Sequence, residues 1–292
     1  MREVTFGITL RGSTSLQRFR EVVCRAEDLG CDVIAAPEHL GVPEPFSVLT
    51  AAAGLTTRPR LRTYVLNAGF WNAALLARAA ATVDVLSEGR LELGLGAGHM
   101  RSEFEEAKLP WTPHRERVGH LERVLLEIRR RLGTPDVQPR PAQEHVPIAV
   151  GAMTSAGLSL AARHADIVAF AGLLQAPGAP AGTFAIASAE QTALRVEEVR
   201  RLAAGRAYRS DALLQVIVLG EDPADAAIRL AREFSAVSAE ELLDTPFVLL
   251  ARNAKHAAEI ITERQRRFGF DSFITHEPNL EALGQVIAAH RG

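Results

Sequence analysis

Eight short apolar runs, most of them followed by a stretch with helical periodicity, recur along the chain and limit its fold more than any other feature. The predicted strands are 4–10, 31–40, 61–67, 90–98, 146–151, 166–172, 212–220 and 271–276. The predicted helices are 15–30, 45–57, 73–89, 113–133, 155–165, 189–204, 223–235, a short piece at 238–243, 253–268 and 279–290. Continuous apolar strands joined by helices are typical of a parallel sheet covered on both faces.

Eight such units predict an α/β fold, a (β/α)8 TIM barrel formed as one domain over residues 1–292. A barrel of this kind uses roughly 250 residues, which agrees with the length of the chain. A doubly wound open sheet is the alternative, but it usually has fewer units. Its nucleotide-binding turn would follow the first strand, where the sequence "RGSTS" at 11–15 contains no G-x-G-x-x-G motif.

Composition excludes several classes of function. The chain has 33 basic and 35 acidic residues and no basic block, so neither nucleic acid nor an anionic membrane is an expected partner. No apolar run approaches the ~20 residues of a membrane helix. Two cysteines and the lack of a signal peptide predict a cytoplasmic protein. Without an H-x-x-x-H pair, a cysteine cluster or a G-x-S-x-G motif, we expect no metal site and no serine hydrolase.

In such a barrel the functional site lies at the C-terminal ends of the strands. Polar residues and glycines follow several predicted strands: Glu38, His39, Asn67, Gly96, Gly98, His99, Arg101, Gly220, Glu221 and His276. A histidine is a suitable proton donor because its usual pKa of ~6.5 lies close to neutral pH. We therefore select His39 and His99 as candidate donors, whereas a structural, hydrogen-bonded role is favoured for His276.

Two further patterns at these strand ends are each open to two interpretations. The alternating glycines of "LELGLGAGHMRSE" (91–103), Gly94, Gly96 and Gly98, allow either tight packing or a bulge, or the close approach of a flat cofactor. After the fifth strand, Thr154 and Ser155 begin a helix. Its free N–H groups could hold a phosphate, or Thr154 or Ser155 could be an ordinary N-cap.

Several longer stretches taken together are distinctive. They are "RAEDLGCDVIAAPEHL" (25–40), "LRTYVLNAGFWNAALLARAAATVDVLSEGRLELGLGAGHMRSEFEEAKLP" (61–110), "PIAVG" (147–151) with "LSLAARHADIVAF" (158–170), and "TPFVLLARNAKHAAEIITERQRRFGFDSFI" (245–274). With them the chain resembles the luciferase-like flavin/deazaflavin oxidoreductase family, and most closely its actinobacterial branch of coenzyme F420-dependent enzymes. That family is an eight-stranded barrel and usually dimeric.

The resemblance implies roles for individual residues. It implies an acidic–histidine pair facing the cofactor ring, with Glu38 orienting His39. His99 falls where some F420 enzymes carry a catalytic acid and where this branch usually has an aromatic residue. At the exit of the third strand it implies a non-prolyl cis peptide or bulge that backs the ring. The residues that it implies for cofactor binding are Val65, Leu66, Asn67, Gly96, Ala97, Gly98, Arg101, Gly151, Ala152, Met153, Thr154 and Ser155. The last five form the family's phosphate-binding loop.

Two departures from the family bear on the site. The loop "GAMTS" (151–155) has less glycine than is usual there, and Met153 narrows the approach to it. The segment "TPDVQPRPAQEH" (134–145) is shorter than in most relatives, so we expect an open rim that admits a bulky substrate. The Gly/Ala/Pro-rich loop 172–188 is the predicted lid.

Together these features predict an oxidoreductase: a reductase that transfers hydride from reduced F420 to an activated C=C or C=N bond. The expected substrate is a small molecule or a modified peptide in natural-product biosynthesis, and the expected assembly is a homodimer. An FMN-dependent monooxygenase is the alternative, and a non-catalytic cofactor-binding barrel is the second.

Overall fold

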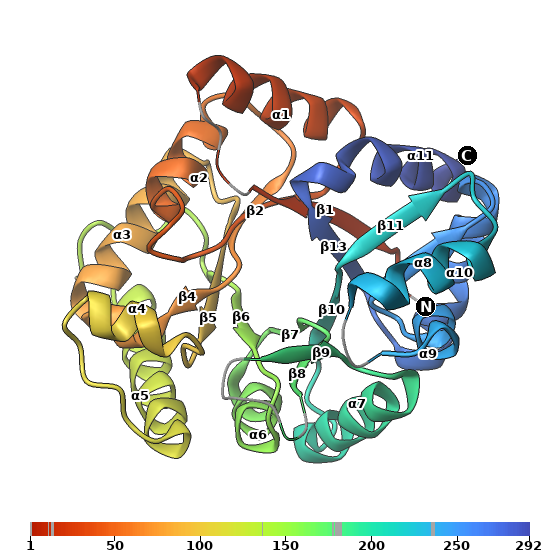
Figure 1. Ribbon diagram of the computed structural model, residues 1–292. Helices are drawn as coiled ribbons and strands as arrows, with labels where there is room; N and C mark the ends of the chain where they lie inside the picture. Colours follow the sequence, from red (N-terminus) through yellow and green to blue (C-terminus); the bar gives the residue numbers. More distant parts are fainter. Residues whose placement is uncertain are drawn as a thin grey trace.

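The computed structural model of the chain describes residues 2–10, 12, 15–135, 137–176, 178, 183–234 and 237–292. It contains a ring of parallel strands surrounded by helices (Figure 1). The strands of the ring are β1 (Thr5–Thr9), β2 (Val33–Ala36), β3 (Arg60–Thr63), β4 (Leu66–Asn67), β5 (Leu91–Gly96), β6 (Ile148–Gly151), β7 (Ile167–Phe170), β10 (Arg209–Leu214) and β13 (Ser272–His276).

The ring closes because the first strand pairs with the last. Each strand pairs with its neighbours in the order β3, β2, β1, β13, β10, β7, β6, β5, β4, and a further pairing of β3 with β5 completes the circle. The short strand β4 continues the third strand beyond β3, which gives eight strand positions. The predicted closed α/β barrel is therefore confirmed.

The helices lie around the outside of the ring (Figure 1). They are α1 (Leu16–Asp28), α2 (Pro45–Ala53), α3 (Ala73–Leu86), α4 (Arg101–Glu106), α5 (His114–Leu132), α6 (Ser155–His164), α7 (Ala189–Ala203), α8 (Pro223–Glu233), α9 (Ala239–Asp244), α10 (Ala254–Phe268) and α11 (Leu280–Arg291), with 3-10 turns η1 (Ala68–Phe70) and η2 (Glu277–Asn279). Side-chain caps begin many of them, as Ser15 does for α1 and Asn72 for α3. Across the ranges described, none of these helices is both long and apolar enough to cross a bilayer.

The prediction for the seventh strand was only half right. Residues 212–214 belong to β10, but the chain after Gln215 forms β11 (Val216–Leu219), which leaves the ring. It pairs with β12 (Val248–Ala251), a strand that the sequence analysis missed. Gly220 and Glu221 therefore follow β11 and do not stand at the end of a barrel strand, which corrects their place among the strand-end candidates.

The expectation for residues 134–145 was wrong. This segment connects a helix to a strand, and such connections lie at the N-terminal face of a barrel. Gln143 confirms its position, because its Nε2 donates to the carbonyl of Leu91, the first residue of β5, at 2.8 Å. The segment, of which Asp136 lies outside the described residues, therefore cannot open the rim of a site at the C-terminal face.

Side chains fill the interior of the barrel below that face. One layer is apolar and contains Val33, Ala35, Tyr64, Ala169, Leu213 and Ile274. Toward the N-terminal end, the fully buried Arg62 donates from Nε to Glu92 Oε2 at 2.6 Å and also bonds Asp211. Burial raises the pKa of Glu92, but Arg62 and Arg209 outweigh it and hold this pKa at about 2. A ligand site must therefore lie above these layers.

Candidate functional site

The C-terminal ends of β2, β4, β5 and β6 carry most of the predicted site residues. Glu38 and His39 follow β2, Leu66 and Asn67 form β4, and Gly96 ends β5. Gly151 ends β6, Thr154 is the N-cap of α6, and Ser155 is its first residue. The parallel register pairs Asn67 with Gly96, so the ends of β4 and β5 lie side by side.

The two candidate histidines lie together at this face. Their rings meet edge to face, with centroids 5.7 Å apart and planes at 89°. His39 Nδ1 donates to Oε1 of Glu103 at 2.9 Å, and the backbone N–H of Leu40 donates to the same oxygen at 3.3 Å. The partner of His39 is thus a carboxylate on α4 that the sequence analysis did not select.

The expectation that Glu38 orients His39 was therefore wrong. Neighbouring residues on an extended chain point to opposite sides, and Glu38 turns toward β4. Its Oε2 accepts from the backbone N–H of Asn67 at 2.6 Å, and its Oε1 accepts from Trp71 Nε1 at 2.8 Å. Burial raises the pKa of Glu38 to about 7, even though both hydrogen bonds favour the carboxylate. Glu38 thus holds the end of β4 and can change charge near neutral pH.

His99 has a different environment from His39. Burial lowers its pKa, and the nearby His39 and Arg117 lower it further. Its second face meets the ring of Phe184 at 5.5 Å. Phe184 begins β9 (Phe184–Ile186), which pairs with β8 (Leu173–Gln175) in an antiparallel hairpin. The predicted lid 172–188 thus contains a hairpin that reaches His99. Residues 177 and 179–182 of this segment lie outside the described residues.

The glycines of β5 make room for the exit of the third strand. A methyl group on Gly94 would lie 1.9 Å from the carbonyl oxygen of Thr63, and one on Gly96 would lie 2.9 Å from Val65 Cγ2. A methyl group on Gly151 would lie 3.1 Å from the same Val65 atom. The structure therefore favours the packing interpretation of this pattern. The three glycines leave room for Val65 to lie inward, where it packs against the apolar cluster of the barrel interior.

Gly98 has a separate reason to be glycine. Its φ is +74°, a region that favours glycine, and a methyl group there would lie 2.5 Å from Asn67 Oδ1. The Tyr64–Val65 peptide is cis, which confirms the feature that the family resemblance implied at this strand exit. Leu66, in contrast, is fully buried in the core cluster between barrel and helices. Of the neighbours Val65 and Leu66, only Val65 presents its side chain to the barrel interior.

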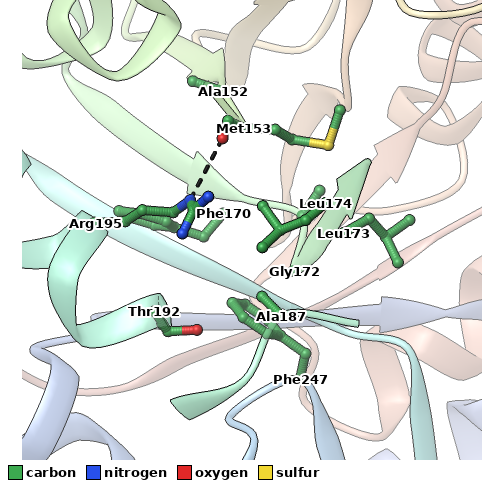
Figure 2. A pocket seen from close by; sticks show the side chains of 11 residues that line it. Ala152, Met153, Phe170, Gly172, Leu173, Leu174, Ala187, Thr192, Arg195 and Phe247 are labelled. Carbon is green, nitrogen blue, oxygen red and sulfur yellow. Dashed lines mark hydrogen bonds between the residues drawn. The ribbon is translucent and has the colours of Figure 1, made fainter. Parts of the chain in front are cut away.

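The start of α6 is a second polar region of this face. Thr154 Oγ1 accepts from the N–H of Gly157 at 3.3 Å and lies 3.5 Å from His114 Nε2. Arg195 of α7 donates from Nε to the carbonyl of Met153 at 3.4 Å, as Figure 2 shows. This contact borders a small apolar cavity lined by Ala152, Met153, Phe170, Leu174 and Phe247, among others. Two basic side chains therefore flank the first turn of α6.

The remaining predicted residues are less directly engaged. Arg101 is exposed and donates from Nε to Glu105 at 2.7 Å, within α4. Ala97 is half-buried and packs against the core. His276 accepts from Thr9 Oγ1 or donates to it at 3.0 Å and lies 3.3 Å from Gln215 Oε1, which agrees with a hydrogen-bonded histidine.

Sequence reasoning missed Glu103, Phe184, His114 and Arg195. None of the four left a local signal in the sequence, since their contacts join distant segments; the partner of Glu103, for example, is His39, 64 residues earlier.

A family model agrees with this geometry along most of the chain. Residues 4–272 match the model described as luciferase-like monooxygenase. The chain belongs to the luciferase-like monooxygenase family.

Individual relatives of this family member share part of its sequence. The F420-dependent glucose-6-phosphate dehydrogenase of Amycolatopsis mediterranei (strain U-32) is 33% identical over 125 residues, which are 40% of this chain and 37% of that protein. The matched region of such relatives thus spans less than half of their length.

Solved structures share the fold of this family member over nearly its whole length. The coenzyme F420-dependent tetrahydromethanopterin reductase from Methanopyrus kandleri superposes with a TM-score of 0.74 at 19% identity and covers 99% of both chains. A monooxygenase from Streptomyces bottropensis superposes with a TM-score of 0.71 at 21% identity, covering 98% of this chain and 97% of that one. At these identities the likeness concerns the fold alone.

Proposed function

We propose that this protein is an oxidoreductase, a reductase that uses reduced F420 to deliver hydride to an activated C=C or C=N bond. The observation that carries the proposal is the contact between His39 and His99, whose ring centroids lie 5.7 Å apart at the C-terminal face. Sequence similarity to F420-dependent dehydrogenases supports the choice of cofactor.

The residues at this face fit a flat ring with an anionic tail. Val65 offers an apolar surface that Gly94, Gly96 and Gly151 leave clear of other side chains. The first turn of α6 has free N–H groups. Arg195 adds a positively charged donor beside this turn, and His114 adds an imidazole. Of the predicted loop, Met153, Thr154 and Ser155 would therefore hold a phosphate through backbone N–H groups. The N–H of Ala152 donates to the carbonyl of Ala169 at 3.3 Å, and Ser155 Oγ donates to Glu198 Oε2 at 3.3 Å.

The cofactor supplies the hydride when it is bound, and this chain supplies position and a proton. His39 or His99 donates the proton to the substrate atom next to the one that receives hydride. Glu38 holds β4 and Trp71 in place, so that Val65 keeps its position. The hairpin contacts His99 through Phe184, whose ring centroid lies 5.5 Å from that of His99.

The expected substrate is an organic molecule of natural-product metabolism, including a modified peptide. Two exposed apolar side chains support a substrate with apolar groups, because Leu40 directly follows His39 and Met100 directly follows His99. An uncharged substrate would lose little hydration free energy when it contacts these two side chains.

We also propose a homodimer that forms through α2 and α3. These two helices pack side by side, and α3 exposes Leu75 (51%), Val85 (45%) and Leu86 (57%). The sequence of α2 contains no charged residue. Exposed apolar side chains of this kind are typical of a protein–protein contact, and the exposed charged residue of α3 among them is Arg78. The cytoplasmic location stays a prediction.

Binding and turnover with the two cofactors test the proposal. A ligand at 100 times its Kd should stabilise the protein by ~2.7 kcal/mol, so F420 should raise the melting temperature. A reductase keeps turning over under nitrogen, whereas an FMN-dependent monooxygenase, the activity named in the family's description, would stop without oxygen. If neither F420 nor FMN raises the melting temperature, the non-catalytic interpretation replaces both.

A further inference from the structure

Glu103 is a buried carboxylate that receives two hydrogen bonds from one neighbouring loop. It lies in the first turn of α4 and is 9% exposed. Its Oε1 accepts from His39 Nδ1 at 2.9 Å and from the backbone N–H of Leu40 at 3.3 Å. Because the N–H of Leu40 also donates to this oxygen, Oε1 of Glu103 points to the loop after β2 and not to solvent.

This geometry determines which nitrogen of His39 keeps its proton. An ionised carboxylate only accepts hydrogen bonds, so Nδ1 must carry a hydrogen. The second nitrogen, Nε2, is then the one that gains or loses a proton. Within the described part of the chain, Nε2 has no hydrogen-bond partner, and the side chain is about one-third exposed. Nε2 can therefore reach a bound molecule.

His99 lacks such a partner. Its ring contacts in the described chain are the rings of His39 and Phe184, and within the described residues its ring nitrogens form no hydrogen bond to a carboxylate. The two histidines that the sequence could not rank are therefore not equivalent. One ring is held by a carboxylate and the other by ring packing.

We propose that Glu103 is the positioning residue of the site, which holds His39 in its Nδ1–H form and makes Nε2 the atom that donates the proton. The inference rests on the proposed reductase function for its chemical meaning. In the transfer, protonated His39 releases the Nε2 proton and becomes neutral; the Nδ1 hydrogen stays on His39, hydrogen-bonded to Glu103. The double bond takes up that proton and the hydride from the reduced F420, which is oxidised, so atoms and electrons balance.

The first test uses the protein without cofactor, so it does not depend on F420. Nitrogen-15 NMR of the histidine rings, at a pH where His39 is neutral, identifies the protonated nitrogen. We expect Nδ1–H in the wild type and in Glu103→Gln, whose amide oxygen can still accept. In Glu103→Ala we expect the Nε2–H form that free histidine prefers. Glu105→Gln, a change on the exposed side of α4, is the matched control and should leave the spectrum unchanged.

The second test measures reduction of 2-cyclohexenone, an activated C=C probe, by reduced F420 under nitrogen. Glu103→Ala should lower kcat about tenfold or more with little change in KM, and Glu103→Gln should restore part of the loss. Glu105→Gln should match the wild type.

The two tests separate the inference from the proposed function. Nε2–H in wild-type His39, or the same tautomer in the wild type and a folded Glu103→Ala variant, would overturn the role of Glu103. If Glu103→Ala does not fold, Glu103→Met, which fills similar space and offers no oxygen acceptor, replaces it, and an unchanged Nδ1–H signal in that variant overturns the role as well. If the His39 tautomer changes on loss of Glu103 but the protein binds no F420, the role of Glu103 is supported and the proposed reductase function is rejected.

Discussion

The alternating glycines of β5 lead to a quantitative prediction for Gly96→Ala. The added methyl group would lie 2.9 Å from Val65 Cγ2, whereas carbon atoms in contact are ordinarily about 3.5–4.0 Å apart. Val65 must therefore move by several tenths of an ångström or more, away from Gly96. Overpacking of this kind costs about 1–3 kcal/mol.

The same displacement moves Val65 into the space proposed for the cofactor ring. We therefore expect Gly96→Ala to lower the free energy of unfolding in urea by about 1–3 kcal/mol and to weaken F420 binding at least tenfold, which is about 1.4 kcal/mol. Adding Val65→Ala removes the clashing methyl groups. In a double-mutant cycle on stability, the two changes should couple by about 1 kcal/mol.

Gly119→Ala is the matched control for this variant. A methyl group at Gly119, on α5, would have one neighbour within 4 Å, Arg123 Nη1 at 3.7 Å. Alanine is the better helix former, so this change should stabilise the protein by about 0.5–1 kcal/mol and leave F420 binding unaltered. If Gly96→Ala behaves like Gly119→Ala in both assays, Val65 is not packed against β5 as described.

Three further predictions concern stability and assembly. Arg62→Met should destabilise the protein by about 3–5 kcal/mol in urea, because it leaves the buried carboxylates of Glu92 and Asp211 without this cation. Adding Asp211→Asn should recover part of the loss. The pKa of Glu92, about 2 in the folded protein against 4.5, means stability that is present above pH 4.5 and lost as pH falls toward 2. That loss is about 3 kcal/mol, and a flat stability from pH 5 to 2 would contradict it. Val85→Lys should convert the dimer to monomer in sedimentation velocity, and a wild-type monomer would reject the proposed interface.

The barrel could be predicted from sequence because each strand is a local signal. A run such as "VPIAVG" (146–151) is apolar, short and bounded by other elements, whatever its neighbours are. β12 was not predicted because it pairs with β11 outside the ring. With eight apolar runs already assigned to the barrel, a ninth run was not assigned to a strand.

The contacts within the site were harder to predict because they join distant parts of the chain. His39 and Glu103 are 64 residues apart, and nothing near either one indicates the pairing. Glu38 was the natural partner for His39 on the basis of sequence order, but neighbouring residues on an extended chain face opposite ways. The glycine pattern is visible in the sequence, yet its cause is Val65, some 30 residues earlier.

Titration of the wild-type protein with F420, with FMN in parallel, tests the central claim most directly. Changes in protein fluorescence on binding give both affinities in one experiment. The account predicts saturable binding of F420, at one site per chain, that is tighter than the binding of FMN. Binding of FMN alone, or of neither cofactor, would contradict it.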